Sequence, residues 1–484
     1  MYACVFNLYK MSDLNSSALL DTLRQILGAS HVLTDGDLSQ YEQDWRKRSR
    51  GKALAVVRPA NTQEVSAIVK ACANTKVSIV PQGGNTGLVV GSIPDESGTQ
   101  VVLSMQRMQR VRNVDADNLT ITVEAGCTLQ SVQDAADKAG YLFPLSLGSE
   151  GSCTIGGNLG TNAGGTQVVR YGNARELCLG LEVVTASGEV MHGLSGLRKD
   201  NTGYDLRNLM IGSEGTLGII TAATMKLFPK PAATLTAWAA VPSVPAAVEL
   251  LGLAHQHLGA SLTGFEMMNQ FSLGLVNKHF PQMRIPLWNE TPYCVLLENS
   301  DTESQEHARE RFEHLLEVAL DTGCVTDAVV AENLSQAHNF WHIRESITMA
   351  QAQEGLNIKH DISLSVSSIA AFVEKTDAQL AKEIPGVRLV NFGHLGDGNL
   401  HYNVQVPEGH DNAAFLKDYE ERVNHLVYDS VKSFGGSISA EHGIGSLKVD
   451  SLPDYKDPTA LALMRQVKHA LDPLGILNPG RVVR

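Results

Sequence analysis

Histidine, glycine and acidic residues are concentrated in one segment of the chain, GHLGDGNLHYN at 393–403. Its Gly-Asp-Gly turn signal separates two short extended runs, so a hairpin there would bring His394 and His401 toward each other from neighbouring strands. Further along, the sequence SAEHGIG supplies the adjacent pair Glu441 and His442. Two histidines and a carboxylate can hold a divalent metal ion and leave coordination positions open for a substrate. The alternative is that both histidines are ordinary hydrogen-bonded turn residues.

A second group of polar residues has the chemistry to bind an anion. Arg344 and Thr348 are four residues apart, so a helix would present both on one face. Lys359 follows in the next extended run, and Asn403 shares a strand face with His401. A solvated helix face is the alternative, because that is where most charged side chains lie. In a chain with a net charge of −13, however, two cations and a hydroxyl in one pocket would suit a carboxylate.

Glycine-rich loops are the other concentrated signal, and they lie in the first half of the chain. PQGGNTGL occupies 81–88 directly after a predicted strand, a longer cluster occupies 148–165, and GSEGTLG occupies 212–218. Glycine lets the backbone approach a ligand closely, and successive backbone N–H groups can form a nest for phosphate oxygens. Tight turns are the alternative for any one cluster. The motifs GxGxxG and GxxxxGK[ST] do not occur, which argues against a nicotinamide-binding Rossmann site and a P-loop.

Together the three glycine clusters resemble the FAD-binding module of flavoproteins of the vanillyl-alcohol oxidase type, over about residues 54–231. The resemblance implies that 82–88 hold the pyrophosphate, that the second cluster lines the isoalloxazine and ribityl side, and that Ile220 meets the adenine. It also implies that the asparagine of the closing motif NPGR approaches the flavin. The implied cofactor-binding residues are Pro81, Gln82, Gly83, Gly84, Asn85, Thr86, Gly87, Leu88, Gly148, Gly151, Ser152, Ile155, Gly156, Gly157, Asn162, Gly164, Gly165, Gly215, Ile219, Ile220 and Asn478. Some members of the family attach the flavin covalently, but no histidine lies in or beside PQGGNTGL, so non-covalent FAD is expected.

The histidine-rich segments resemble the C-terminal domain of the D-2-hydroxyglutarate and D-lactate dehydrogenase group of the same flavoprotein family. The resemblance implies that His394, His401 and Glu441 bind zinc or a similar ion and that His442 is the general base. Apart from the resemblance, His360 is a second candidate for the base if His442 does not take that role. The substrate-binding residues implied by the dicarboxylate pattern are Arg344, Thr348, Lys359, Asn403 and His442. The implied reaction is oxidation of a D-2-hydroxy acid with FAD as the hydride acceptor. Reduced FAD would then pass its electrons to an electron-transfer flavoprotein or a quinone.

Three other functions stay open at this stage. The nearest is the same chemistry on D-lactate, glycolate or another monocarboxylate. The second is an FAD-dependent alkyl transferase of the alkyl-glycerone-phosphate synthase type, and the third is a non-catalytic FAD subunit of a larger oxidase. The last two would not require the full histidine and glutamate set beside Arg344 and Lys359.

The elements that must position these residues follow an α+β pattern. Apolar periodicity predicts a helix at 16–27, and the segment 54–80 is typical of a strand, a helix capped at Asn61 or Thr62, and a second strand at 77–80. Further strands are predicted at 100–103, 120–123, 179–184, 218–226, 294–298 and 388–391, and helices at 303–320 and 413–433.

The predicted fold class is therefore α+β. It comprises a two-subdomain FAD-binding domain of the PCMH type, an α+β substrate or cap domain, and a C-terminal segment that returns to the flavin. The expected boundaries are 1–52 for an N-terminal helical segment, 53–231 for the FAD-binding domain, 232–430 for the substrate domain with the metal site, and 431–484 for the C-terminal segment.

Size and composition exclude several classes of partner. A chain of 484 residues is too long for one hydrophobic core, and the net charge of −13 argues against nucleic acid and anionic membrane as partners. No apolar run is long and unbroken enough for a transmembrane helix, and the start MYACVFNLYKMSDL lacks the basic region of a signal peptide. Seven cysteines without CxxC spacing indicate reduced thiols and a cytoplasmic location. The oligomeric state stays open, with a homodimer as one option.

Overall fold

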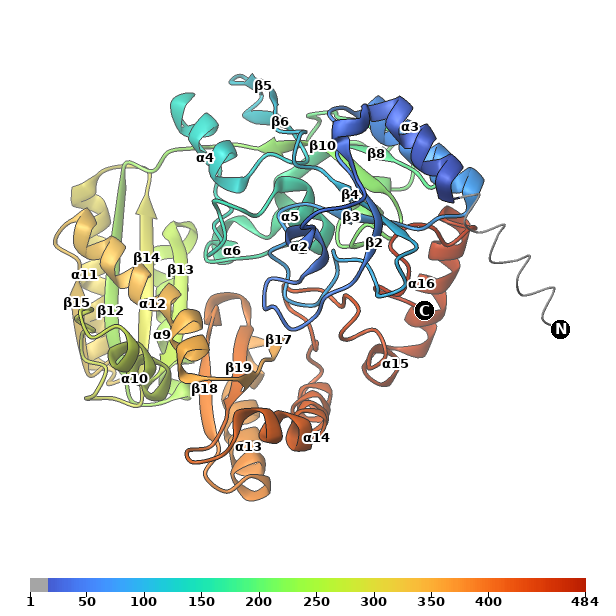
Figure 1. The fold of residues 1–484 in the computed structure, drawn as a ribbon. Helices are drawn as coiled ribbons and strands as arrows, with labels where there is room; N and C mark the ends of the chain where they lie inside the picture. The colour runs from blue at the N-terminus through green and yellow to red at the C-terminus, as the bar shows by residue number, and fades with distance from the viewer. Residues whose placement is uncertain (1–15) are drawn as a thin grey trace. The chain divides into compact units, whose positions relative to one another are not determined.

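The computed structural model describes residues 16–484, which contacts divide into two compact units (Figure 1). The first unit combines the described residues up to Ala163 with Asn173–Pro229 and His442–Arg484, and the second combines Gly164–Gly172 with Lys230–Glu441. Both units mix helices and sheets, so the α+β class is confirmed. The substrate domain predicted at 232–430 corresponds to a unit that continues to Glu441 and takes in a short piece of the glycine-rich sequence. The start MYACVFNLYKMSDL, for which the sequence predicts no signal peptide, lies outside the described residues.

A small mixed sheet belongs to the first unit. Its strand order is β1 (Val32–Leu33), β2 (Ala53–Val57), β4 (Gln100–Ser104) and β3 (Ile79–Gln82), and both β2 and β3 run parallel to β4. Helix α3 (Thr62–Thr75) connects β2 to β3 and begins where the Asn61 side chain accepts a hydrogen bond from Glu64 N at 2.9 Å, which confirms the predicted cap. The sequence predicts the second strand at 77–80, but β3 starts two residues later and includes Pro81 and Gln82. Proline is tolerated there because β3 is an edge strand.

An antiparallel sheet forms the other half of the first unit. Its order is β5 (Val111–Asp115), β6 (Thr120–Glu124), β10 (Ile219–Lys226), β8 (Cys178–Val184) and β9 (Val190–Gly193). β6, β10 and β8 lie close to the strands predicted from the sequence, whereas β5 and β9 are not among them. The two central strands, β8 and β10, are buried along nearly their whole length, so they form the core. Shorter elements complete the unit: η1 (Ala29–His31), α2 (Ser39–Glu42), α4 (Leu129–Lys138), β7 (Tyr141–Leu142), α5 (Ile155–Thr161), α7 (Ala174–Leu177), α8 (Leu206–Met210), β11 (Phe228–Pro229), α15 (Leu452–Tyr455) and α16 (Pro458–Leu471).

The second unit is built on a sheet in which every pair is antiparallel. Its order is β15 (Asp327–Val330), β12 (Ala233–Val241), β14 (Tyr293–Asp301), β13 (Leu262–Asn269), β18 (Arg388–Gly393), β19 (Asn399–Gln405) and β16 (Asn357–Ile358), while β17 (Asp361–Ser363) also pairs with β19. β18 and β19 form the hairpin predicted around Gly-Asp-Gly. Its turn is the 3-10 helix η3 (Leu395–Asp397), which ends at Gly398 with φ 86°. The central strand β13 is not among the strands predicted from the sequence.

Helices pack on this sheet: α6 (Val168–Tyr171), α9 (Val244–Leu258), α10 (Gln270–His279), α11 (Gln305–Asp321), α12 (Leu334–Glu354), α13 (Val366–Glu383) and α14 (Asn412–Ser433). α11 and α14 confirm the helices predicted at 303–320 and 413–433. Residues of α10 and α12, including Leu273 and Ile343, share one core with Trp238, Met268 and Phe392 of the sheet. That core fixes which face of α12 is turned toward β13 and β18.

Two further expectations concern membranes and thiols. Among residues 16–484 there is no helix with both the length and the apolar character needed to cross a bilayer. The six cysteines in that range are free and buried. Burial raises the pKa of the Cys72 and Cys178 thiols to about 12, so neither is a reactive thiolate.

Candidate functional site

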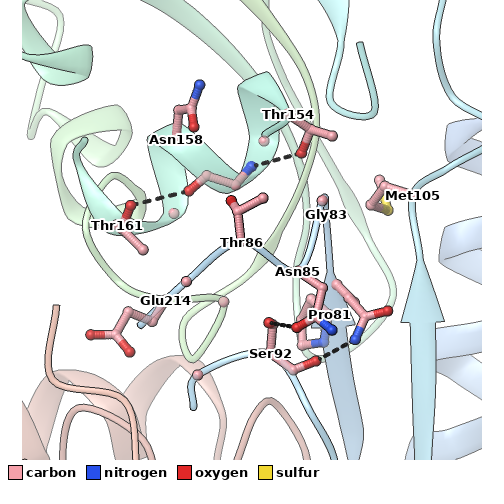
Figure 2. A pocket seen from close by; sticks show the side chains of 18 of the residues that line it. Pro81, Gly83, Asn85, Thr86, Ser92, Met105, Thr154, Asn158, Thr161 and Glu214 are labelled. Atoms are coloured by element: carbon pink, nitrogen blue, oxygen red, sulfur yellow. Dashed lines mark hydrogen bonds between the residues drawn. The ribbon is translucent and has the colours of Figure 1, made fainter. Parts of the chain in front are cut away.

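The first unit contains a cavity at which all three glycine clusters meet (Figure 2). It encloses about 960 Å³ of space that no protein atom occupies, open solvent included. His442, the predicted general base, is on its wall. The predicted cofactor-binding residues that line it are Pro81, Gln82, Gly83, Gly84, Asn85, Thr86, Gly87, Gly156, Gly157, Gly215, Ile219 and Ile220.

The loop after β3 is fixed by hydrogen bonds from its own polar side chains. Gln82 Nε2 donates to the carbonyl oxygens of Tyr41 at 2.9 Å and Ser92 at 2.8 Å. Asn85 has φ 53°, and its Oδ1 accepts from Ser92 Oγ at 2.9 Å. A Cβ on Gly87 would meet nothing within 4 Å, so the backbone there faces open space. A rigid loop with bare backbone on the cavity side fits the pyrophosphate of a dinucleotide.

The first turn of α5 packs against the same loop. Thr154 caps this helix with its hydroxyl. A Cβ on Gly83 would lie 2.3 Å from Thr154 Oγ1, and one on Gly84 would lie 1.9 Å from the carbonyl oxygen of Ser152. Glycine at these two positions is therefore required by the close approach of loop and helix. Gly160 borders the cavity and has open space where a Cβ would lie.

Nine predicted cofactor residues are not on the cavity wall: Leu88, Gly148, Gly151, Ser152, Ile155, Asn162, Gly164, Gly165 and Asn478. Asn162 ends α5 in the left-handed conformation, and its Oδ1 accepts from Arg175 N at 3.0 Å. Asn478 Nδ2 donates to the carbonyl oxygens of Gly91 at 2.9 Å and Glu214 at 2.7 Å, so it ties two lining loops together.

Several lining residues are absent from the sequence-based set: Val89, Gly91, Ser92, Met105, Cys153, Thr154, Asn158, Gly160, Thr161, Glu214 and Gly218. Most of them lie inside or beside the glycine clusters, so the motifs carried a signal for them. Met105 follows β4, outside every cluster, and no pattern in the sequence marks it.

Glu214 holds the segment that carries His442. Its carboxylate accepts hydrogen bonds from Ile444 N at 2.6 Å and Gly445 N at 2.8 Å. Burial raises the pKa of Glu214, and the two backbone N–H groups oppose that rise. Gly443 has φ 83°, and a Cβ there would lie 2.5 Å from Glu214 Oε1, so this turn requires glycine. These contacts fix His442 on the cavity wall.

The second unit brings together the three residues predicted as metal ligands. His394 follows β18, His401 lies on β19, and Glu441 ends the unit. One ligand atom from each of them lies within 4.8 Å of the others. The rings of His394 and His401 are 5.5 Å apart, which confirms the geometry predicted for the hairpin. Two imidazoles and a carboxylate at these distances fit a divalent ion such as zinc.

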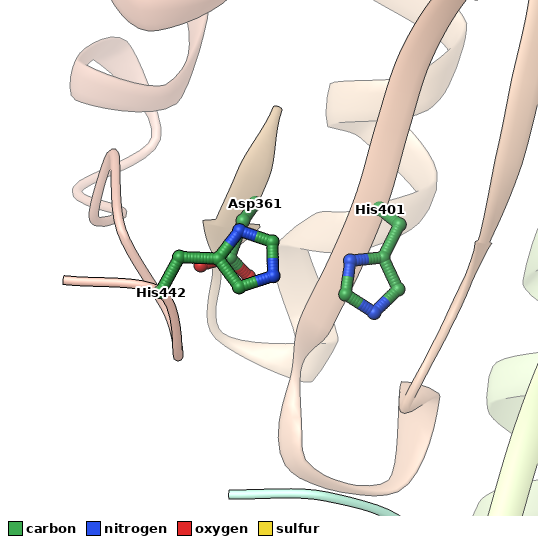
Figure 3. A group of neighbouring side chains, drawn as sticks. All are labelled: Asp361, His401 and His442. Carbon is green, nitrogen blue, oxygen red and sulfur yellow. The ribbon is translucent and has the colours of Figure 1, made fainter. Parts of the chain in front are cut away.

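Asp361 supports this cluster from β17, and the sequence interpretation misses it. Asp361 is the register partner of His401, and the two side chains lie beside each other (Figure 3). Its Oδ2 accepts from Glu441 N at 2.9 Å, and its Oδ1 accepts from Asn399 Nδ2 at 3.0 Å. Glu441 Oε1 in turn accepts from Gly165 N at 2.6 Å. Gly165 therefore contacts a predicted metal ligand, and its contact with the flavin stays a prediction.

A buried carboxylate, Glu266 on β13, lies against His394. Its Oε1 is 2.6 Å from His394 Nδ1, and its Oε2 accepts a hydrogen bond from Arg344 Nε at 2.8 Å and forms an ion pair with Arg344 Nη2 at 2.7 Å. Burial alone would raise the pKa of Glu266, but Arg344 and His394 outweigh it and lower that pKa to about 2. Burial would lower the pKa of His394, but Glu266 and Glu441 outweigh it and raise that pKa. The sequence interpretation misses Glu266, although a lone acidic residue in the apolar run GFEMM is a usable signal.

The predicted cations lie on α12 and the strands after it. Arg344 and Thr348 are both on α12, as predicted. The guanidinium of Arg344 lies 4.7 Å from the centre of the Phe392 ring. Its Nε donates to Glu266 and its Nη2 forms an ion pair with Glu266, so Nη1 is the nitrogen with neither a hydrogen bond nor an ion pair to any residue in 16–484. Lys359 is half-buried between β16 and β17.

Asn403 has other partners. Its Oδ1 accepts from His360 N at 3.0 Å, and its Nδ2 donates to Gln351 Oε1 at 3.1 Å. These bonds connect β19 to α12 and to the segment after β16. One N–H of the Asn403 amide takes no part in these two bonds, and its contact with a substrate stays a prediction.

Known proteins match both halves of the chain. Residues 53–193 match the model of the FAD binding domain, and residues 230–482 match that of the C-terminal domain of FAD linked oxidases. A mitochondrial D-2-hydroxyglutarate dehydrogenase from Arabidopsis thaliana is 39% identical over 95% of this chain and 80% of its own. A Schizosaccharomyces pombe protein provisionally named a mitochondrial D-lactate dehydrogenase is 36% identical over 96% of this chain and 90% of its own. Among solved structures, p-cresol methylhydroxylase with substrate bound superposes with a TM-score of 0.77 at 18% identity, covering 96% of each chain, which shows a shared fold.

Proposed function

The chain belongs to the family of FAD-linked oxidases, and on that premise we propose that it oxidises a D-2-hydroxy acid to the 2-oxo acid, with D-2-hydroxyglutarate as the preferred substrate. The observation that carries this proposal is the buried contact from Arg344 through Glu266 to His394, which places a cation beside the predicted metal ligands. A 2-hydroxydicarboxylate needs both groups, because its hydroxy acid end and its distal carboxylate must be bound at the same time.

In the proposed reaction, FAD and a divalent ion supply part of the chemistry, and side chains of the protein supply the rest. FAD in the cavity would accept the hydride, and a divalent ion held by His394, His401 and Glu441 would polarise the substrate's hydroxyl and C1 carboxylate. The chain supplies the base: we assign to His442 the removal of the C2 hydroxyl proton, because it lies on the cavity wall and directly follows Glu441 in the sequence.

In the same proposal, the distal carboxylate of the substrate is bound by Arg344, Thr348 and Lys359. Arg344 Nη1 and the Lys359 ammonium offer charge-assisted hydrogen bonds, which discriminate a dicarboxylate from D-lactate. The electrons leave FAD for an external acceptor, an electron-transfer flavoprotein or a quinone. A homodimer and a cytoplasmic location stay predictions, and the Arabidopsis relative carries a mitochondrial name.

A screen of D- and L-2-hydroxy acids with an artificial dye acceptor tests the proposal. D-2-hydroxyglutarate should give the highest kcat/KM. In Lys359→Ala that value should fall on the order of 10- to 100-fold, and the value for D-lactate much less, because one charge-assisted hydrogen bond contributes roughly 1.5–3 kcal/mol. Equal losses would place Lys359 at the C1 end of the substrate. A wild-type preference for D-lactate or glycolate would overturn the substrate assignment, and a flavin that no hydroxy acid bleaches would favour an alkyl transferase or a non-catalytic subunit.

We also propose that the FAD is bound non-covalently. The loop at 81–92 contains neither histidine nor cysteine, and burial raises the pKa of the Cys153 thiol on the cavity wall. Acid precipitation of the yellow protein should release the flavin into the supernatant, where its absorbance is measured. A yellow pellet under a colourless supernatant would show a covalent bond instead.

A further inference from the structure

Glu266 contacts a predicted metal ligand and a predicted substrate-binding cation at the same time. Its side chain is fully buried in the middle of β13. One oxygen lies 2.6 Å from His394 Nδ1, and the other accepts a hydrogen bond from Arg344 Nε at 2.8 Å and lies 2.7 Å from Arg344 Nη2 as an ion pair. A charged side chain is rarely fully buried unless it is paired. Both carboxylate oxygens of Glu266 are therefore committed to the site.

The fold produces this double contact through the alternation of β13. Met268, two residues after Glu266, belongs to the core that α12 covers, and successive strand residues point to opposite faces. Glu266 thus faces α12, which presents Arg344. β18 pairs with β13, so His394, which directly follows the end of β18, lies beside Glu266 as well.

The contact with Glu266 decides which nitrogen of His394 can bind an ion. A carboxylate has no hydrogen to donate, so Nδ1 carries the hydrogen of this bond and Nε2 is the nitrogen left to bind an ion. Nε2 is the nitrogen nearer Glu441, 3.8 Å from its Oε1. Metal-binding histidines usually donate their second N–H to a carboxylate in this way, which fixes the orientation of the ring.

We propose that Glu266 is the positioning residue of the site. With one oxygen it holds His394 ready for the ion, and with the other it orients Arg344 so that Nη1 meets the distal carboxylate of the substrate. This inference rests on the proposed function and adds that ion binding and dicarboxylate selectivity both depend on Glu266. Loss of Glu266 should weaken ion binding and dicarboxylate selectivity together, whereas loss of a carboxylate with a purely structural role should change neither.

Glu266→Gln tests the proposal, with Glu298→Gln as the matched control. Glutamine has one acceptor oxygen and an NH2 group, so it cannot accept from both His394 and Arg344. Glu298 is also a buried carboxylate, on the adjacent strand β14. It accepts hydrogen bonds from Trp341 Nε1 at 2.8 Å and Thr263 Oγ1 at 3.0 Å, and it contacts no predicted ligand.

FAD-loaded proteins are stripped of metal and titrated with zinc against a competing chelating indicator. Zinc affinity should fall about 10- to 100-fold in Glu266→Gln and stay at the wild-type value in Glu298→Gln. In the zinc-saturated proteins, the ratio of kcat/KM for D-2-hydroxyglutarate to that for D-lactate should also fall only in Glu266→Gln. Wild-type zinc affinity in Glu266→Gln would overturn the inference. Wild-type protein that binds no zinc would instead overturn the metal part of the proposed function.

Flavin content and the midpoint of thermal unfolding check that each variant is folded. If Glu266→Gln does not fold, Glu266→Asp takes its place, because it keeps the charge and shortens the side chain by one methylene. The shorter carboxylate cannot reach both partners in their present positions, so its zinc affinity should also be reduced. An affinity equal to the wild-type value would overturn the inference in this variant as well.

Discussion

Dialysis of the FAD-loaded protein against a strong chelator is expected to abolish turnover while the flavin stays bound. Turnover should be lost because polarisation of the substrate depends on the ion assigned to His394, His401 and Glu441. The flavin should be retained because the cavity wall belongs to the first unit, whereas these three residues belong to the second. Dye-linked turnover and flavin absorbance are measured on the same sample, before and after zinc is added back.

A pair of variants separates loss of the ion from other effects of the chelator. His401→Ala should reproduce the loss of turnover without chelation, because it removes one of the three ligands. His342→Ala is the matched control, since His342 is an exposed histidine on α12 with no part in the site, and its activity should be unchanged. Full activity in a preparation that elemental analysis shows to be free of metal would contradict the assignment.

The features that the sequence predicts correctly depend on residues close together in the chain. The start of α3 is one, because Asn61 caps an N–H only three residues away. The hairpin of His394 and His401 is another, because Gly398 can adopt the positive φ that its turn requires. The i,i+4 spacing of Arg344 and Thr348 likewise needs only a helix to bring them to one face.

The features that the sequence does not predict depend on long-range pairing. Glu266 meets Arg344 and His394 from 78 and 128 positions away, and Asp361 meets Glu441 from 80 positions away. The apolar periodicity of a single segment cannot predict contacts between residues so far apart in the sequence. Such contacts depend on the order of the strands in the sheet.

The glycine clusters show a related limit. Composition indicates that a loop approaches something closely, but it does not indicate what. At Gly83 the near neighbour is Thr154, the cap of α5, at Gly84 it is the carbonyl oxygen of Ser152, and at Gly164 it is the carboxylate of Glu441. Only the folded chain distinguishes these glycines from Gly87 and Gly160, which border open space.

His442→Asn is expected to lower kcat by about 10²- to 10⁴-fold, the usual contribution of a general base. Asparagine is similar in size and can form hydrogen bonds, but it cannot take a proton near neutral pH. The segment should keep its place because Glu214 holds it through the backbone N–H groups of Ile444 and Gly445. Turnover is measured at saturating substrate, with zinc and flavin content determined on the same preparation.

The pH profile distinguishes loss of a base from loss of binding. In the wild type, kcat/KM should rise with pH as the base loses its proton, and in His442→Asn this rise should disappear. A loss of only a few-fold, with the rise retained, would assign the base to another residue. His360, the second candidate, is poorly placed for that role. It is fully buried, its Nδ1 lies 2.8 Å from the carbonyl oxygen of Tyr402, and its Nε2 lies 2.9 Å from Asn424 Oδ1. Both ring nitrogens of His360 are therefore occupied within the protein, whereas His442 lies on the wall of the cavity that the flavin is proposed to fill.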